Sequence, residues 1–147
     1  MFRVLRAVVV TSLLLPLAAM AQMRGRHPGY GHALQDLRFA RAVLERHEGW
    51  GPVAADQRRA VVEIDRAVDE LSRAAIDDGR NPNAHPPVDV RWEPRDRLHR
   101  AMDALGRARD SISREEDNPA ARGWRDRAFR HIDMAQRVLG HAMDRWH

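Results

Sequence analysis

The chain has 147 residues, with no cysteine and with 25 basic residues that are all arginine. The absence of cysteine excludes disulfide bonds and thiolate metal ligands. The formal net charge of +4 falls to +2 when Arg3 and Arg6 are set aside, and the remaining charges alternate in sign along the chain. Interleaved charges are typical of a salt-bridged helical surface, so we predict that the protein does not bind nucleic acid.

The first residues have the pattern of a secretory signal peptide, which we expect to span residues 1–21. The stretch MFRVLRAVVVTSLLLPLAAMAQ has two early arginines, a short apolar core and an A-x-A cleavage site before Gln22. The apolar core is too short for a membrane span. We therefore expect a periplasmic or secreted protein whose residues 22–147 form a single domain with no membrane span.

Four further segments carry apolar residues at helical spacing. The first helix is predicted over about 28–47 and the second over about 52–79, each opening with a proline. The third is predicted to start near Pro94, and the fourth follows Asn118 as its N-cap. The predicted apolar stripe of the fourth helix contains Trp124, Ala128, His131, Ala135, Val138, Ala142 and Trp146.

No alternating pattern long enough for a β-sheet occurs, so the expected fold is all-α. The apolar spacings resemble heptad steps, which favours an antiparallel four-helix bundle. Short turns would join the first helix to the second and the third to the fourth. The longer loop over residues 80–90, with three prolines, leaves an up-down-up-down order favoured but not required.

Several short motifs occur together along the predicted helices and loops: HPGYGHALQDLRFAR from His27, AAIDDG from Ala74, HPPVD from His85, EEDN from Glu115 and RHID from Arg130. In this combination the chain resembles a group of small, exported, helical bacterial proteins that are uncharacterised. The resemblance spans most of the residues after the signal peptide. It implies export and a helical fold, and it implies no function.

His131 stands on the predicted apolar stripe where a leucine is expected. In an up-down-up-down bundle the first and fourth helices are neighbours, and Asp36 and Asp65 lie at the same height as His131. A carboxylate on one ring nitrogen would fix the tautomer and leave the other nitrogen for a metal or a proton. The alternative is a buried polar group that is simply satisfied, and the absence of any E-x-x-H motif favours this second interpretation.

A second candidate site is a histidine-rich end of the same up-down-up-down arrangement. Histidines with nearby carboxylates suit Cu(II), Ni(II) or Zn(II). The residues predicted to gather there are His27, His32, His85, His99, His141, His147, Asp78 and Asp89. No close H-x-H or H-x₃-H spacing occurs among them, and histidines are also common at helix ends for electrostatic reasons.

Three classes of function remain after these observations. The leading hypothesis is a non-catalytic bundle of the bacterial cell envelope that has a binding or structural role, without a cofactor, toward an envelope protein or a ligand. The alternative is a periplasmic metal- or haem-binding bundle. An enzyme ranks third, because every serine after the signal peptide lies inside a predicted helix, with no glycine-rich elbow.

Overall fold

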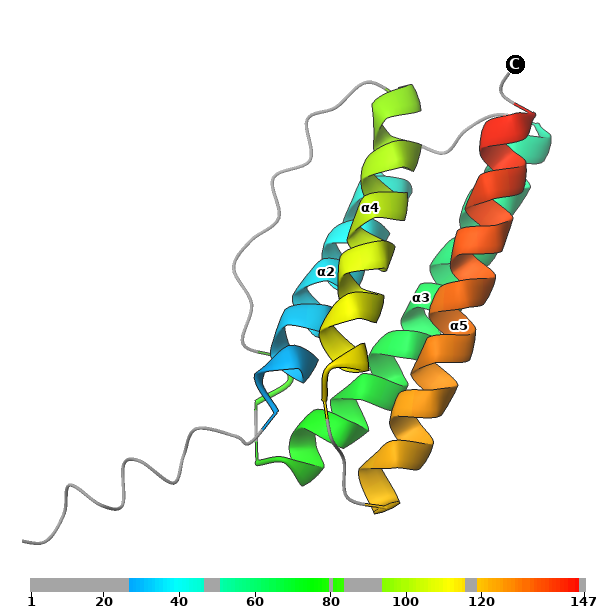
Figure 1. Cartoon of the computed structure of the whole chain (residues 1–147). Helices are drawn as coiled ribbons and strands as arrows, with labels where there is room; N and C mark the ends of the chain where they lie inside the picture. The colour runs from blue at the N-terminus through cyan, green and yellow to red at the C-terminus, as the bar shows by residue number, and fades with distance from the viewer. Residues whose placement is uncertain (1–26, 47–50, 80, 84–93, 116–118, 146–147) are drawn as a thin grey trace, which may run out of the picture.

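The computed structural model describes residues 27–46, 51–79, 81–83, 94–115 and 119–145. These residues form four helices: α2 (Pro28–Glu45), α3 (Pro52–Asp77), α4 (Pro94–Ser113) and α5 (Pro119–Asp144). The predicted all-α four-helix bundle is confirmed (Figure 1). The predicted signal peptide lies outside the described residues. None of the helices in the described part combines the length and the apolarity of a membrane-spanning segment.

Local sequence signals explain where the helices begin and end. All four begin at a proline, whose fixed φ suits the first helical turn and whose missing N–H is not needed there. At the end of α3, Gly79 has a φ of 73°, and its N–H donates to the carbonyl of Ile76. Positive φ favours glycine, so the chain leaves the helix at this position.

The core is built from small and large apolar residues that alternate at heptad spacing. Fully buried alanines recur every seventh residue in α3 and α5. They are Ala60, Ala67 and Ala74 in α3, and Ala128, Ala135 and Ala142 in α5. Larger residues such as Leu37, Leu71, Leu105 and Leu139 are buried between them and join all four helices in one cluster. Alanine at such positions lets helix axes approach closely.

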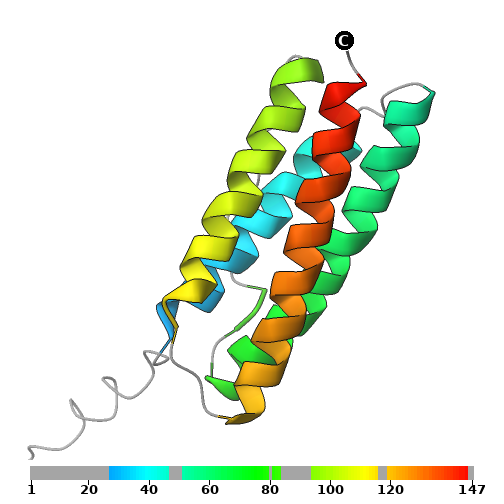
Figure 2. The same ribbon diagram turned by 45° about the vertical axis from the view of Figure 1, so that its right-hand side comes forward.

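The order of the helices differs from the up-down-up-down expectation. In Figure 1, α2 and α5 run upward while α3 and α4 both run downward. The closest pairs are α3 with α5 and α2 with α4, and α2 does not contact α5. In Figure 2, α5 accordingly lies between α4 and α3, with α2 behind it. The expected order is wrong because heptad stripes specify that helices pack, and they do not specify which neighbour each helix takes.

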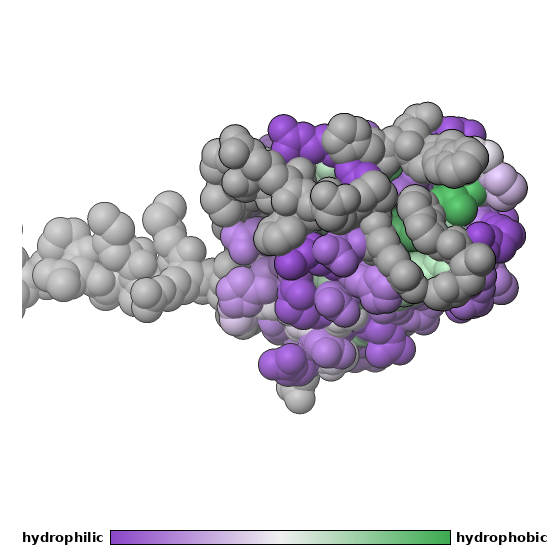
Figure 3. Space-filling model, turned by 90° about the horizontal axis from the view of Figure 1, so that it is seen from above, coloured by the Kyte–Doolittle hydropathy of each residue, from purple (hydrophilic) through white to green (hydrophobic). Residues whose placement is uncertain are grey.

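The described surface at the upper end of the bundle is mainly hydrophilic, with a small hydrophobic area beside residues drawn in grey (Figure 3). Two larger apolar side chains are exposed along α3, namely Val62 and Ile76. Scattered apolar residues of this kind are normal on a folded protein. These two side chains therefore do not indicate a binding surface.

Candidate functional site

His131 lies at the edge of the contact between α3 and α5 and pairs with Glu63. Its Nδ1 is 2.7 Å from Oε2 of Glu63, and the other carboxylate oxygen accepts a hydrogen bond from Arg66 at 2.7 Å. With an ionised carboxylate as acceptor, Nδ1 must carry the proton. The predicted type of pair, a histidine held by a carboxylate, is thus present with a partner that we did not predict.

The position of His131 also differs from the expectation. Its side chain is 26 % exposed, so it flanks the core and does not occupy its centre. The central positions belong to Ile132 and Leu139, both fully buried. The predicted stripe used the steps 128, 131, 135 and 138, whereas 132 and 139 are buried beside 128, 135 and 138, so only the step at 131 is wrong among these four. Both 131 and 132 lie three or four residues from 128 and from 135, so the pattern alone does not separate them.

The two carboxylates predicted to reach His131 have other partners. Asp36 accepts a hydrogen bond from Nε of Arg107 at 2.9 Å, and Asp65 accepts one from Nε of Arg41 at 2.6 Å. The Asp36–His131 pair is excluded by the topology, because α2 and α5 lie diagonally across the bundle. These three predicted residues therefore do not form one site.

Glu63 belongs to a row of acidic residues along α3, together with Asp56 and Glu70. They lie seven residues apart, and each pairs with a basic residue that is in α5 or directly follows it. Asp56 pairs with Arg145, and Glu70 lies 2.9 Å from Arg127. The hydrogen bond from Arg127 lowers the pKa of Glu70 from its ordinary 4.5, although burial opposes this shift. The same bond raises the pKa of Arg127. Charge rows of this kind set the register of neighbouring helices.

A second histidine–carboxylate pair lies at the lower end of the bundle, where α2 begins and α4 ends. His27 Nδ1 is 2.8 Å from Oε2 of Glu115, and the backbone N–H of His27 donates to Asp78. The other oxygen of Glu115 accepts a hydrogen bond from the N–H of Gly29. Glu115, just past the end of α4, therefore caps α2, which satisfies an N–H group that has no intrahelical partner.

Gly29 is required by the close approach of α2 and α4 at this end. A Cβ atom built on Gly29 would lie 2.5 Å from the carbonyl oxygen of Ser111 and would also collide with Glu115. The backbone oxygen cannot move aside as a flexible side chain could. The HPGY segment thus has a packing role that the sequence analysis did not assign.

The predicted histidine-rich end is divided between both ends of the bundle. His27 and His32 lie near the start of α2, whereas His99 and His141 lie at the opposite end, near the start of α4 and the end of α5. His85, His147 and Asp89 lie outside the described residues. Within the described ranges, no three His, Asp or Glu side chains come close enough together to hold a metal ion. The prediction of one gathered cluster is wrong because it depended on the up-down-up-down order.

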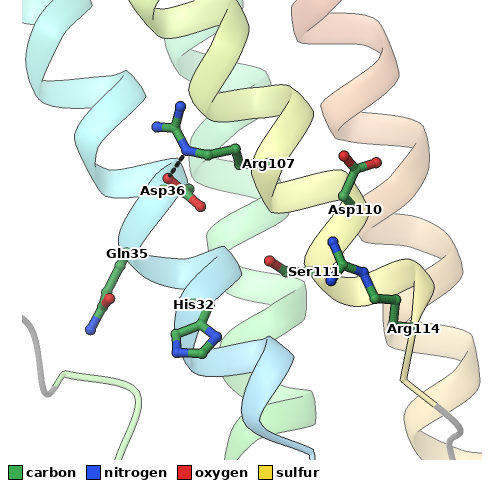
Figure 4. Close-up of a pocket in the computed structure, with 7 residues that line it drawn as sticks. All are labelled: His32, Gln35, Asp36, Arg107, Asp110, Ser111 and Arg114. Atoms are coloured by element: carbon green, nitrogen blue, oxygen red, sulfur yellow. Dashed lines mark hydrogen bonds and ion pairs between the residues drawn. The ribbon is translucent and has the colours of Figure 1, made fainter.

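A pocket of about 330 Å³ lies between α2 and α4, above the His27–Glu115 pair. We call it the α2–α4 pocket. The residues that line it all have polar side chains (Figure 4): His32, Gln35, Asp36, Arg107, Asp110, Ser111 and Arg114. Arg107 extends from α4 to Asp36 on α2, so this ion pair bridges the two helices. His32 and Asp36, two residues singled out from the sequence, therefore lie in one pocket.

Several side chains of the α2–α4 pocket have no partner among the residues that the structure describes. No hydrogen bond or ion pair there involves the side chains of His32, Gln35, Asp110 or Arg114. The lining therefore presents free donors and free acceptors to solvent. Sequence reasoning missed Arg107, Asp110 and Arg114, and their common spacing on one face of α4 is the signal that could have found them.

Buried polar groups elsewhere do not extend this pocket. The hydroxyl of Tyr30 and Nε of Arg97 are buried without a hydrogen bond, and neither residue lines the α2–α4 pocket. His27 and His131, whose Nδ1 atoms are held by carboxylates, do not line it either.

Comparisons with protein-family models, curated proteins and solved structures found no match.

Proposed function

We propose that this protein is an exported, non-catalytic binding bundle of the bacterial cell envelope whose ligand site is the α2–α4 pocket. The observation that carries the proposal is a pocket between two helices whose lining includes side chains that have no partner among the described residues. Small-molecule sites are concave and contain a few polar groups that fix the ligand's orientation. Export is proposed from the signal-peptide pattern of residues 1–21, with cleavage before Gln22.

The arrangement of the pocket argues against a hydrolase. Ser111 and His32 line the same pocket, but no hydrogen bond joins them. Asp36, the third residue of a conceivable relay, accepts a hydrogen bond from Arg107 instead of orienting the histidine. A serine nucleophile requires a base within hydrogen-bonding distance and a group that orients the base. The described residues of the pocket therefore suit the binding of a ligand better than the activation of Ser111 as a nucleophile.

The described residues do not support metal binding, the alternative that the sequence suggested. No group of ligands for one metal ion occurs within the described ranges. The histidines on which that alternative depended lie at opposite ends of the bundle. The proposed ligand is consequently an organic molecule that forms hydrogen bonds.

The proposal is tested by thermal unfolding of residues 22–147 against a panel of small polar metabolites. We expect at least one compound to raise the melting temperature with a saturable concentration dependence, because a ligand that binds only the folded state stabilises it. The stabilisation should be lost in Arg114→Ala. It should persist in Arg130→Ala, which removes an exposed arginine that does not line the pocket.

Two results would overturn this proposal. One is a panel in which no compound stabilises the protein. The other is stabilisation that Arg114→Ala leaves unchanged, because the ligand would then bind elsewhere. Export is tested separately by sequencing the N-terminus of the protein made from the full chain in a bacterial host. An N-terminus at Gln22 is expected, and an uncleaved protein in the cytoplasm would contradict export.

A further inference from the structure

The charges of the α2–α4 pocket are balanced but separated. Arg107 and Arg114 supply two positive groups, and Asp36 and Asp110 supply two negative groups. Only Arg107 and Asp36 are paired with each other. Asp110 and Arg114 lie four residues apart on α4, a spacing that allows an ion pair, yet no ion pair forms between them. The pocket thus offers one unpaired cation and one unpaired anion.

Arg107 is held by Asp36 through one of its three nitrogens. Asp36 accepts only its Nε–H, and the two terminal nitrogens point away from Asp36 in Figure 4. The terminal N–H groups of a guanidinium can donate two parallel hydrogen bonds to a carboxylate. Holding Arg107 through its Nε also fixes the direction of that fork. In Figure 4 this fork also points away from Asp110, Ser111 and Arg114, so Arg114 is the cation of the pocket that remains for a ligand.

The charge balance discriminates between classes of ligand. A simple anion would be attracted by Arg107 and Arg114 but repelled by Asp110. A simple cation would be attracted by Asp110 but repelled by the two arginines. Like-charge contacts and unpaired charges in a site are the usual means by which a protein rejects the wrong partner. A molecule with a positive and a negative group satisfies both sides. Gln35 and Ser111 can bind either group, because an amide and a hydroxyl both donate and accept.

We infer that the α2–α4 pocket binds a small zwitterion of the α-amino acid class, with its carboxylate on Arg114 and its ammonium on Asp110. The pocket, with a volume of about 330 Å³, is large enough to admit such a molecule. The inference rests on the proposed binding function and specifies its ligand. No step of chemistry is involved, because the pocket only recognises the two charged groups.

The test compares three probes that differ by one charged group. L-alanine carries both groups, propionate lacks the ammonium and ethylammonium lacks the carboxylate. Binding to residues 22–147 is measured by NMR titration of backbone amides, which also identifies the residues that respond. We expect L-alanine to bind at least about tenfold more tightly than either of the other probes. The shifted amides should lie between residues 32 and 36 and between residues 107 and 114.

Charge-removing variants assign the two groups to their partners. Asp110→Asn should abolish the preference for L-alanine over propionate, and Arg114→Gln should abolish its preference over ethylammonium. Asp103→Asn is the matched control, because Asp103 is an exposed residue of α4 that does not line the pocket. Asp110 and Arg114 are exposed and unpaired, so both variants should retain the circular dichroism spectrum of the native protein.

The outcomes separate this inference from the proposed function. Equal affinity for L-alanine and propionate, or no binding of L-alanine at the pocket, overturns the zwitterion inference. If a compound of the metabolite panel still stabilises the protein and depends on Arg114, the binding function stands with a different ligand. If no compound of the panel does so, the proposed function fails as well.

Discussion

Between α3 and α5, the acidic residues Asp56, Glu63 and Glu70 each have a basic partner in α5 or directly after it. Between α2 and α4, the ion pair of Asp36 with Arg107 bridges the helices, and the nearby side chains of Asp110 and Arg114 have no partner in the described part of the chain. A paired and half-buried charge contributes to helix register and is costly to orphan. An unpaired charge at the surface costs little and can bind a ligand. The comparison thus separates structural polar contacts from groups available for binding.

The largest effect is expected from overpacking the alanine row of α5. Ala135 is fully buried, so Ala135→Leu forces additional methylene groups into the core. We expect a loss of about 1–3 kcal/mol in the free energy of unfolding, measured by urea denaturation. Ala120→Leu is the control in the same helix, because Ala120 is exposed. Equal stability of the two variants would show that the helices do not pack as closely as described.

Gly29→Ala tests the close contact at the lower end of the other helix pair. The added methyl group collides with the carbonyl of Ser111 and with Glu115, so we expect a loss of about 1–3 kcal/mol. Gly140→Ala is a matched control, because a Cβ at Gly140 meets no atom within 4 Å. In urea denaturation the control should match or exceed the native stability, since alanine favours a helix. A tolerated Gly29→Ala would contradict the helix approach at this end.

Breaking the Glu63–His131 pair separates a structural role from a functional one. Glu63→Ala removes the acceptor of a half-buried histidine, and we expect a loss of about 1–3 kcal/mol in urea denaturation. His131→Leu should cost less, because Glu63 keeps Arg66 as its partner. The double variant should be more stable than Glu63→Ala alone. If His131→Leu lowers the free energy of unfolding as much as Glu63→Ala does, the pair stabilises the fold by more than satisfying the hydrogen bonds of two polar groups.

The Glu70–Arg127 pair predicts a pH dependence of stability. Because the hydrogen bond from Arg127 lowers the pKa of Glu70 in the folded state, the pair stabilises the protein above the ordinary value of 4.5. This contribution is lost as the pH falls through the lower pKa of the folded state. The stability difference between native protein and Glu70→Gln should therefore be constant near neutral pH and shrink in acid.

The smallest effect is expected from Asp36→Ala. Asp36 pairs with Arg107, whose side chain is 56 % exposed. Exposed ion pairs contribute little, so the free energy of unfolding should change by no more than about 0.5 kcal/mol in urea denaturation. A loss as large as that of Glu63→Ala would mean that the α2–α4 pair is structural, and it would weaken the distinction between the two helix pairs.

The candidate site was only partly accessible to sequence reasoning. His32 and Asp36 were singled out, but for a metal cluster and for a contact with His131 that do not exist in the described structure. Asp56, Glu63 and Glu70 carry a seven-residue spacing that predicts a charge row on one face of α3. Their partners on α5 could not be assigned, because that requires knowing which helices are neighbours.

The sequence by itself determined the four helices and their bounds, since prolines, glycines and apolar spacing act within one or two turns of the chain. Only the tertiary structure decided that α2 pairs with α4 and α3 with α5. The heptad stripes are compatible with more than one arrangement, and the connection between Asp77 and Pro94 is long enough to permit more than one. Which helices become neighbours depends on the packing energy summed over whole helix faces. His131, Asp36 and the α2–α4 pocket acquire their partners only through it.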